Sequence, residues 1–314
     1  MKRKALIVSI KNTHLSKKEE ILLSEEKPWG IILFKRNIKS INQIKELILK
    51  IKTLTKNNKF PIMIDEEGLS VSRLKNIINN DISANFFGDL YNADKVFSRN
   101  ILKHYIYSIT TILNEIGINI NTIPVLDVLR VHTNRIIGNR SFSGDKKIVS
   151  EMGKLTIKLL NKNKIAGVIK HIPGHGGATS DSHKKTPKVS LSLEKLNKID
   201  FYAFKKTKAK FAMTAHIIYK NIDKKNVATF SKKIIKKIIR EKIGYKGILM
   251  TDDISMRALK YDLVTNGKKS LEAGCNLVLY CAGNINDNFK LIKSLPYIDK
   301  FTAKKTSEFF KFLR

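Results

Sequence analysis

The chain has 314 residues, of which 42% are hydrophobic, and this length suits one large globular domain or two smaller ones. Its two cysteines, Cys275 and Cys281, lie in one apolar stretch, which favours reduced core residues over a disulfide scaffold. The apolar run near the basic start is too short for a signal peptide, and no run reaches membrane-spanning length. We therefore expect a cytoplasmic protein with no membrane partner.

The charge balance is unusual, with 60 Lys and Arg against 27 Asp and Glu and a formal net charge of +33. Such a balance can indicate a nucleic-acid partner. The lysines are spread along the chain, however, and Ile and Asn, which AT-rich codons also specify, are in excess as well. We interpret the charge as compositional and expect no specific nucleic-acid partner.

Short apolar runs alternate with amphipathic helices along the chain. Each run is almost continuously apolar, as expected for a strand buried on both faces of a parallel sheet. Strands are predicted at Ala5–Ile10, Gly30–Phe34, Phe60–Ile64, Ile118–Ile120, Gly167–Ile169, Phe211–Thr214, Gly247–Met250 and Asn276–Tyr280. Helices are predicted at Ser40–Lys56, Asp94–Ile116, Lys146–Asn161, Ser192–Lys208 and Ser231–Ile243, with a closing helix pair over Asn284–Arg314.

This order predicts an α/β fold in which residues 1–314 form a single (β/α)8 TIM barrel. A doubly wound sheet is the alternative, but no glycine-rich nucleotide-binding loop follows an early strand. The active site of such a barrel lies at the carboxyl ends of its strands. Polar residues follow five of the predicted strands, namely Asp65, Arg140, Lys170 with His171, His216 and Asp252.

Three consecutive acids, Asp65, Glu66 and Glu67, follow the third strand. Because acids favour the positive amino-terminal end of a helix, we assign Glu66 and Glu67 to a helix start. Asp65 stands at the strand tip and is a candidate ligand-binding residue. Arg140 lies between turn glycines after the fourth strand and is a candidate anchoring donor.

The fifth strand leads into a glycine-rich loop that carries His175, Asp181 and His183. Loops held by a rigid scaffold commonly carry catalytic groups. The histidine spacing fits no standard zinc pattern, so we expect no metal. A carboxylate that accepts from one imidazole nitrogen fixes the tautomer and raises the basicity of the other. Asp181 and His183 are therefore predicted to form an orienting and acid/base pair.

The seventh strand ends in two neighbouring carboxylates, Asp252 and Asp253. Asp253 suits a cap of the following turn, whereas Asp252 comes first after the strand and is expected to point into the mouth of the barrel. No Ser, Cys or Thr in a triad-like setting competes as nucleophile. A carboxylate nucleophile is therefore favoured.

Several segments together resemble the family 3 glycoside hydrolases. They are KHIPGHGG with DSH downstream, IDEEG with Arg73, IGNRSF and TDDISM, supported by PWGIILFKRNI, PVLDV, MTAHIIY, ATFS and LEAGCNLVL. The similarity covers about Gly30 to Cys281, and the combination is specific although each motif alone is weak. The chain departs from the family at Leu69 and Ser70, where Gly and Arg are usual.

The resemblance implies a single TIM barrel in which Asp252 is the nucleophile and His183, oriented by Asp181, is the acid/base. Most retaining glycosidases use two carboxylates, so a histidine would replace one of them. The residues that the resemblance implies for holding an N-acetylglucosamine ring are Asp65, Arg73, Arg140, Lys170 and His171.

The expected function is that of a retaining exo-β-N-acetylglucosaminidase. Its substrates would be peptidoglycan fragments, GlcNAc-1,6-anhydroMurNAc with or without peptide, which a cytoplasmic monomer would cleave without a metal or an organic cofactor. The alternatives are another family 3 glycosidase specificity, a GlcNAc phosphorylase that uses phosphate in place of water, and a non-catalytic barrel that binds polyanions.

Overall fold

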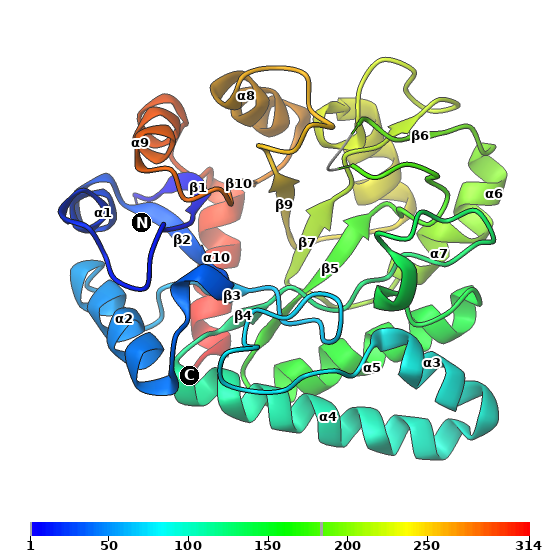
Figure 1. Ribbon diagram of the computed structural model, residues 1–314. Helices are drawn as coiled ribbons and strands as arrows, with labels where there is room; N and C mark the ends of the chain where they lie inside the picture. The colour runs from blue at the N-terminus through cyan, green and yellow to red at the C-terminus, as the bar shows by residue number, and fades with distance from the viewer. Residues whose placement is uncertain (1, 183–184) are drawn as a thin grey trace.

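The computed structural model describes residues 2–182 and 185–314, and eight parallel strands close into a barrel surrounded by helices (Figure 1). The strands follow one another around the barrel in the order β1, β10, β9, β7, β5, β4, β3 and β2. Their bounds are Lys4–Val8 (β1), Pro28–Leu33 (β2), Ile62–Ile64 (β3), Ile120–Asn121 (β4), Ala166–Ile172 (β5), Phe211–Thr214 (β7), Ile248–Asp253 (β9) and Leu277–Leu279 (β10). The predicted TIM barrel and all eight predicted strands are confirmed.

Two strands extend further toward the mouth of the barrel than the apolar runs indicate. β5 includes Lys170 and His171, and β9 includes Asp252 and Asp253. These polar side chains therefore stand on the rigid sheet itself rather than on the loops that follow it. A small parallel sheet of Lys188–Val189 (β6) and Ile218–Tyr219 (β8), which was not predicted, joins the loops after β5 and β7.

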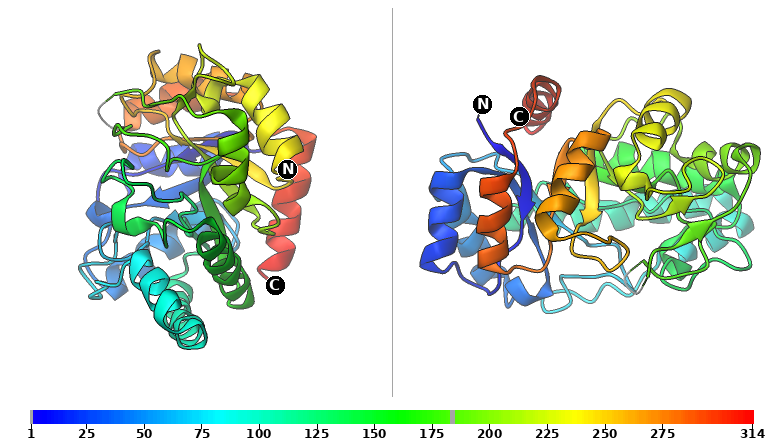
Figure 2. Two further views of the ribbon diagram at one scale, coloured as in Figure 1. Left: turned by 90° about the vertical axis from the view of Figure 1, so that its right-hand side faces the viewer. Right: turned by 90° about the horizontal axis from the view of Figure 1, so that it is seen from above.

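The helices lie outside the barrel in all three views (Figures 1 and 2). The α-helices are Lys17–Ile21 (α1), Ile41–Leu54 (α2), Ala84–Ala93 (α3), Lys95–Ile116 (α4), Lys146–Lys162 (α5), Leu193–Lys198 (α6), Asp200–Phe204 (α7), Leu263–Ala273 (α8), Ile285–Ser294 (α9) and Lys300–Phe312 (α10). Leu22–Glu26 (η1) and Ile234–Lys242 (η5) are π-helical, and Lys35–Asn37 (η2), Gly138–Arg140 (η3) and Ala228–Phe230 (η4) are short 3₁₀ turns. The closing helix pair is confirmed as α9 and α10.

One predicted helix is divided. The segment Ser192–Lys208 forms α6 and α7 with a break at Ile199. Its helical part ends at Phe204, because Lys205 adopts an extended conformation with φ −68° and ψ 139°. The helix expected over Ser231–Ile243 is present as a π-helix. Three further α-helices, α1, α3 and α8, were not predicted.

Aromatic side chains close the amino-terminal end of the barrel. Phe309 of α10 packs against Phe211 of β7 with ring centroids 5.3 Å apart, and Phe211 packs against Trp29 at 5.6 Å. The Trp29 indole N–H donates to Thr306 Oγ1 at 2.9 Å, so its polar atom is satisfied inside the core. Since this end is filled, the polar site lies at the opposite, carboxyl end. No helix in the described ranges is long and apolar enough to cross a membrane.

Candidate active site

A pocket of about 210 Å³ opens at the carboxyl ends of the strands. Its polar lining comes from the loops after β3, β4 and β5 and from strands β5 and β9. These residues are Asp65, Glu67, Arg73, Arg140, Lys170, His171, His175, Ser182 and Asp252. The structure thus brings together six of the predicted site residues, namely Asp65, Arg73, Arg140, Lys170, His171 and Asp252.

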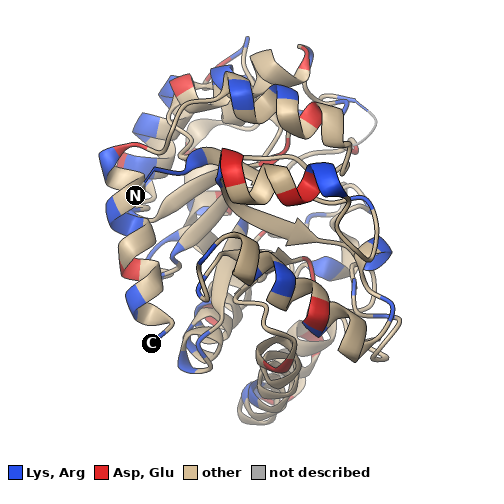
Figure 3. Cartoon of the chain, turned by 90° about the vertical axis from the view of Figure 1, so that its left-hand side faces the viewer, with Lys and Arg blue, Asp and Glu red and all other residues tan. Residues whose placement is uncertain are grey.

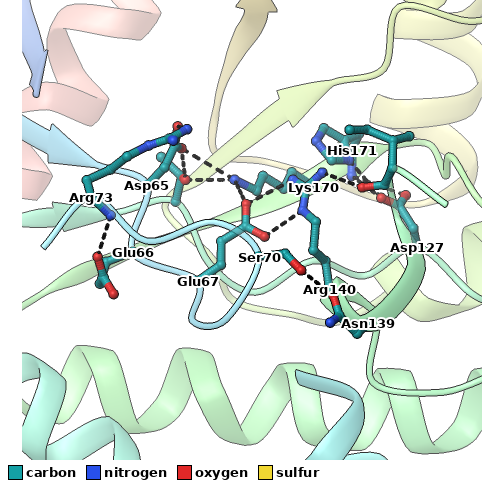
Figure 4. Close-up of polar contacts among 12 residues, drawn as sticks. Asp65, Glu66, Glu67, Ser70, Arg73, Asp127, Asn139, Arg140, Lys170 and His171 are labelled. Atoms are coloured by element: carbon teal, nitrogen blue, oxygen red, sulfur yellow. Dashed lines mark hydrogen bonds and ion pairs between the residues drawn. The ribbon is translucent and has the colours of Figure 1, made fainter. Parts of the chain in front are cut away.

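One wall of the pocket is a row of alternating charges (Figure 4). Arg73 Nη2 lies 3.2 Å from Asp65 Oδ2, and Lys170 Nζ lies 3.4 Å from Asp65 Oδ1. Lys170 Nζ also lies 2.6 Å from Glu67 Oε1, and Arg140 donates to Glu67 through Nε at 2.7 Å and Nη2 at 2.9 Å. Burial alone would raise the pKa of Asp65, but Lys170 and Arg73 outweigh it and hold this pKa well below its usual range.

The assignment of Glu66 and Glu67 to a helix start was wrong, because the chain after β3 forms no helix until α3 begins at Ala84. Glu66 is buried and accepts from the backbone N–H of Arg73 at 2.8 Å and of Leu74 at 3.0 Å. Its other oxygen accepts from Asn80 Nδ2 at 2.5 Å. Glu66 therefore folds the chain back on itself, and this loop brings Arg73 to the pocket.

Glu67 was missed as a site residue because its partners are remote in the sequence. It pairs with Arg140, 73 residues further along the chain, and with Lys170 of β5. Burial would raise the pKa of Glu67, but Arg140 and Lys170 outweigh it and lower this pKa to about 2. Glu67 is therefore an ionised carboxylate that bridges two cations.

Asp127 was also not predicted as a site residue, although it lies in the PVLDV segment after the fourth strand. Its Oδ2 lies 2.7 Å from His171 Nδ1, and its Oδ1 accepts from the backbone N–H of His175 at 2.6 Å. Burial would raise the pKa of Asp127, but the neighbouring His171 outweighs it and lowers this pKa. The contact engages Nδ1 of His171, so Nε2 is the ring nitrogen left for a ligand.

Asp252 is a buried carboxylate at the end of β9. Burial would raise its pKa, but the charges of His171 and His216 outweigh it, so the pKa is lowered and the group is ionised. Asp253 accepts from Ser255 N at 3.1 Å and Ser255 Oγ at 2.6 Å, which confirms its expected role in the following turn. His216 lies between Thr229 Oγ1 at 2.7 Å and the Asp253 carbonyl at 3.1 Å, and it therefore supports this strand end.

The predicted acid/base residue His183 lies outside the described residues. Asp181 is described, and its carbonyl accepts from the Lys185 N–H at 3.1 Å. Ser182, which stands between the two, lines the pocket, so this part of the loop reaches the site. The pairing of Asp181 with His183 stays a prediction.

The described part of the site holds no cluster of metal ligands. Within residues 2–182 and 185–314, no three His, Cys, Asp or Glu side chains are grouped in a way that could hold a metal ion. Because His183 lies outside these ranges, the expected lack of a metal remains a prediction as well.

Comparison with known proteins gives both a fold and a family. Residues 3–303 match the model of the glycosyl hydrolase family 3 N terminal domain. A protein named beta-hexosaminidase from Nitrosomonas eutropha is 31% identical over 307 residues, which covers 96% of this chain and 86% of that relative.

Solved structures agree with the sequence match. Native NagZ from Neisseria gonorrhoeae has a TM-score of 0.90 and 28% identity, covering 100% of this chain and 90% of that one. NagZ from the same organism in complex with N-trifluoroacetyl-D-glucosamine has a TM-score of 0.88 and 29% identity, covering 98% and 90% of the two chains.

The matches extend over almost the whole barrel, including every strand that carries a polar residue of the pocket. They also agree with the chemistry of that pocket, in which a buried, ionised carboxylate faces fixed hydrogen-bond donors. The protein is thus a glycosidase of the β-hexosaminidase kind, and the chain belongs to glycosyl hydrolase family 3.

Proposed function

We propose that this protein is a retaining exo-β-N-acetylglucosaminidase that removes terminal GlcNAc from peptidoglycan fragments. The substrates are GlcNAc-1,6-anhydroMurNAc with or without peptide, and the enzyme works in the cytoplasm as a monomer. The observation that carries the proposal is the ionised Asp252, which shares one pocket with the donors Arg140, Lys170 and His171. The beta-hexosaminidase name of the relative and the glucosamine derivative bound by NagZ support it.

In this mechanism Asp252 attacks the anomeric carbon and forms a glycosyl-enzyme intermediate. His183 protonates the leaving oxygen in the first step, and in the second it takes a proton from the water that releases the sugar. Asp181 orients His183. Asp65, Arg73, Arg140, Lys170 and His171 hold the ring through its hydroxyl groups. The reaction needs neither a metal nor an organic cofactor.

The acidities of the pocket favour a histidine as the acid. A general acid works best when its pKa lies near the operating pH. The pKa values of Asp65, Glu67 and Asp252 are all lowered, so none of these carboxyls holds a proton to give at neutral pH. Burial lowers the pKa of His175 to about 4, which leaves it neutral and a poor acid. These acidities are compatible with the acid/base role that the family resemblance implies for His183.

The test compares two substrates in two variants. Asp252→Ala should abolish turnover of both a nitrophenyl GlcNAc glycoside and the natural disaccharide, because both need the nucleophile. His183→Ala should slow glycosylation by the disaccharide far more, since nitrophenolate departs with little protonation. General acid–base catalysis contributes roughly 10²–10⁴-fold, so the difference in kcat/KM between substrates should be large.

With the nitrophenyl substrate, His183→Ala should be limited by release of the sugar, and added azide should accelerate it. Equal losses on both substrates without azide rescue would remove His183 as the acid/base. Near-normal activity of Asp252→Ala would contradict the proposed mechanism. Turnover of nitrophenyl glucoside in preference to the GlcNAc analogue would indicate another family 3 specificity. Acceleration by phosphate with release of the sugar 1-phosphate would indicate a phosphorylase.

A further inference from the structure

Glu67 occupies a central position in the charged wall of the pocket. It stands between Arg140 and Lys170, and the side chains of these three residues are 6%, 11% and 3% exposed. An ion pair this deeply buried is screened little by salt, and loss of one partner leaves an uncompensated charge. Glu67 therefore sets the electrostatic state of both cations.

The hydrogen bonds of the two cations show which donors Glu67 engages. Lys170 has three N–H groups, and its nitrogen lies 2.6 Å from Glu67, 2.8 Å from Thr122 Oγ1 and 3.4 Å from Asp65. The longest of these contacts is the one that a sugar hydroxyl can replace most readily. Glu67 thus holds Lys170 in place even when a sugar hydroxyl replaces the contact between Lys170 and Asp65.

Arg140 is held in a comparable way. Its Nε and Nη2 donate to the two oxygens of Glu67, and its Nη1 donates to the Ile136 carbonyl at 2.9 Å. A guanidinium has five N–H groups, so one on each terminal nitrogen is left for a ligand. The forked contact fixes the plane of the guanidinium, and the direction of these two remaining N–H groups follows from that plane.

The charges of the wall indicate which ligands it accepts. Arg73, Lys170 and Arg140 face Asp65 and Glu67, which gives the wall a net charge of +1, and the ionised Asp252 of the same pocket brings the sum of these charges to zero. Without Glu67 the same wall would carry +2, and Arg140 would lose its paired carboxylate. A buried cluster of free cations with forked donors is typical of a phosphate or carboxylate site. In a protein with a formal charge of +33, small anions would be concentrated near such a site.

We propose that Glu67 is a positioning and specificity-determining residue, which fixes Arg140 and Lys170 as donors for an uncharged sugar and prevents the pocket from binding anions. The first half rests on the proposed function, because it takes the sugar to be GlcNAc. The second half concerns the charges of the pocket itself and holds for any neutral ligand.

The experiment uses Glu67→Gln, which keeps the shape of the side chain and removes its charge. Glu67→Asp keeps the charge on a shorter side chain, and Glu46→Gln on the exposed face of α2 is the control for loss of one negative charge. Each variant is tested for KM and kcat with nitrophenyl GlcNAc, for inhibition by inorganic phosphate, and for phosphate binding by calorimetry. Circular dichroism verifies folding.

In Glu67→Gln, KM should rise about tenfold or more with a smaller change in kcat, as expected when buried donors lose their fixed direction. Phosphate should become a competitive inhibitor in the millimolar range and bind detectably in the calorimeter. The parent protein, Glu46→Gln and Glu67→Asp should stay insensitive to phosphate at the same concentrations. Glu67→Asp should still show a raised KM, because the shorter carboxylate cannot reach both cations.

A folded Glu67→Gln without phosphate binding would overturn the proposal, and so would phosphate binding by the parent protein. If Glu67→Gln does not fold, Glu67→Asp decides, and an unchanged KM or a gain of phosphate binding in that variant would overturn it. The calorimetric result needs no turnover. Lack of hydrolysis by the parent protein would therefore refute the proposed function alone.

Discussion

At the scale of single residues, Arg140 serves both the pocket and the fold. Arg140→Ala should lower kcat/KM by an amount that corresponds to roughly 1–3 kcal/mol of activation free energy, because ring hydroxyl or carbonyl groups of the sugar lose their donor. It should also lower the free energy of unfolding by about 3 kcal/mol, since Glu67 is left buried with Lys170 as its remaining cation. The control is Arg135→Ala, because Arg135 is an exposed arginine in the same loop. Kinetics and urea unfolding that match the control would contradict this role for Arg140.

Glu67 should also contribute to the pH dependence of stability. Its pKa is lowered from 4.5 to about 2 in the folded protein, so the folded state binds its proton less readily than the unfolded state does. The stability that it contributes is therefore present above about pH 4.5 and is lost as the pH falls toward about 2. A shift of this size corresponds to at most about 3 kcal/mol.

The measurement is the free energy of unfolding at several pH values in this acidic window. Glu67→Gln should be less stable than the parent protein at neutral pH, and the difference should shrink as the pH falls, because the glutamine does not titrate. A constant difference across the window would show that the ionised form of Glu67 is not the stabilising one.

At the scale of elements, the glycine-rich loop after β5 depends on close backbone contact with the loop after β4. A Cβ atom added at Gly176 would stand 1.8 Å from the Val128 carbonyl oxygen, whereas one added at Gly144 would stand 3.3 Å from the Leu129 carbonyl oxygen. Gly176→Ala must therefore displace the loop that carries His175 and leads to Asp181. Gly144→Ala needs only a small adjustment.

We expect Gly176→Ala to lower the free energy of unfolding by roughly 1–3 kcal/mol, the usual range for overpacking, and to reduce kcat/KM as well. Gly144→Ala is the matched control and should remain close to the parent protein in both. Thermal unfolding and kinetics with nitrophenyl GlcNAc provide the comparison. Equal effects of the two substitutions would argue against close packing at Gly176.

The division of one predicted helix into α6 and α7 also belongs to this scale. Asp200 begins α7, and its buried carboxylate pairs with Arg130 from the loop after β4. The α6 helix ends at Lys198, and Ile199 has φ −117° and ψ −70°. The helical spacing of apolar residues continues through this point, so the local pattern does not show the break, which coincides with the contact to a residue 70 positions away. Local propensity gives way to tertiary context here.

At the scale of the whole molecule, the formal charge of +33 is distributed widely. Figure 3 shows Lys and Arg on several helices of one side, interspersed with Asp and Glu. If the charge is compositional, binding to nucleic acid rests on counterion release alone and should vanish near physiological salt. Fluorescence anisotropy with a labelled duplex, titrated at low and physiological salt, measures this. Sequence-specific binding that persists at physiological salt would contradict our interpretation.

The sequence by itself determined the barrel and the strand ends that carry the chemistry. Strands buried on both faces must be almost continuously apolar, so each strand is visible locally. A polar residue that interrupts such a run at its carboxyl end must face the mouth of the barrel, which is how Asp65, Lys170, His171 and Asp252 were found. The roles of Asp252 as nucleophile and of His183 as acid/base were favoured by the residue pattern and implied by the family resemblance, and they stay predictions.

Only the tertiary structure decided what the neighbouring carboxylates do. Glu66, Glu67 and Asp127 look alike in the sequence, as acids that follow strands. Their roles differ in the contacts they make. Glu66 accepts from the backbone of its own loop, Glu67 binds one cation from the loop after β4 and one from β5, and Asp127 binds a histidine 44 positions away. Such contacts depend on closure of the barrel, which places distant strand ends side by side, and no local pattern encodes them.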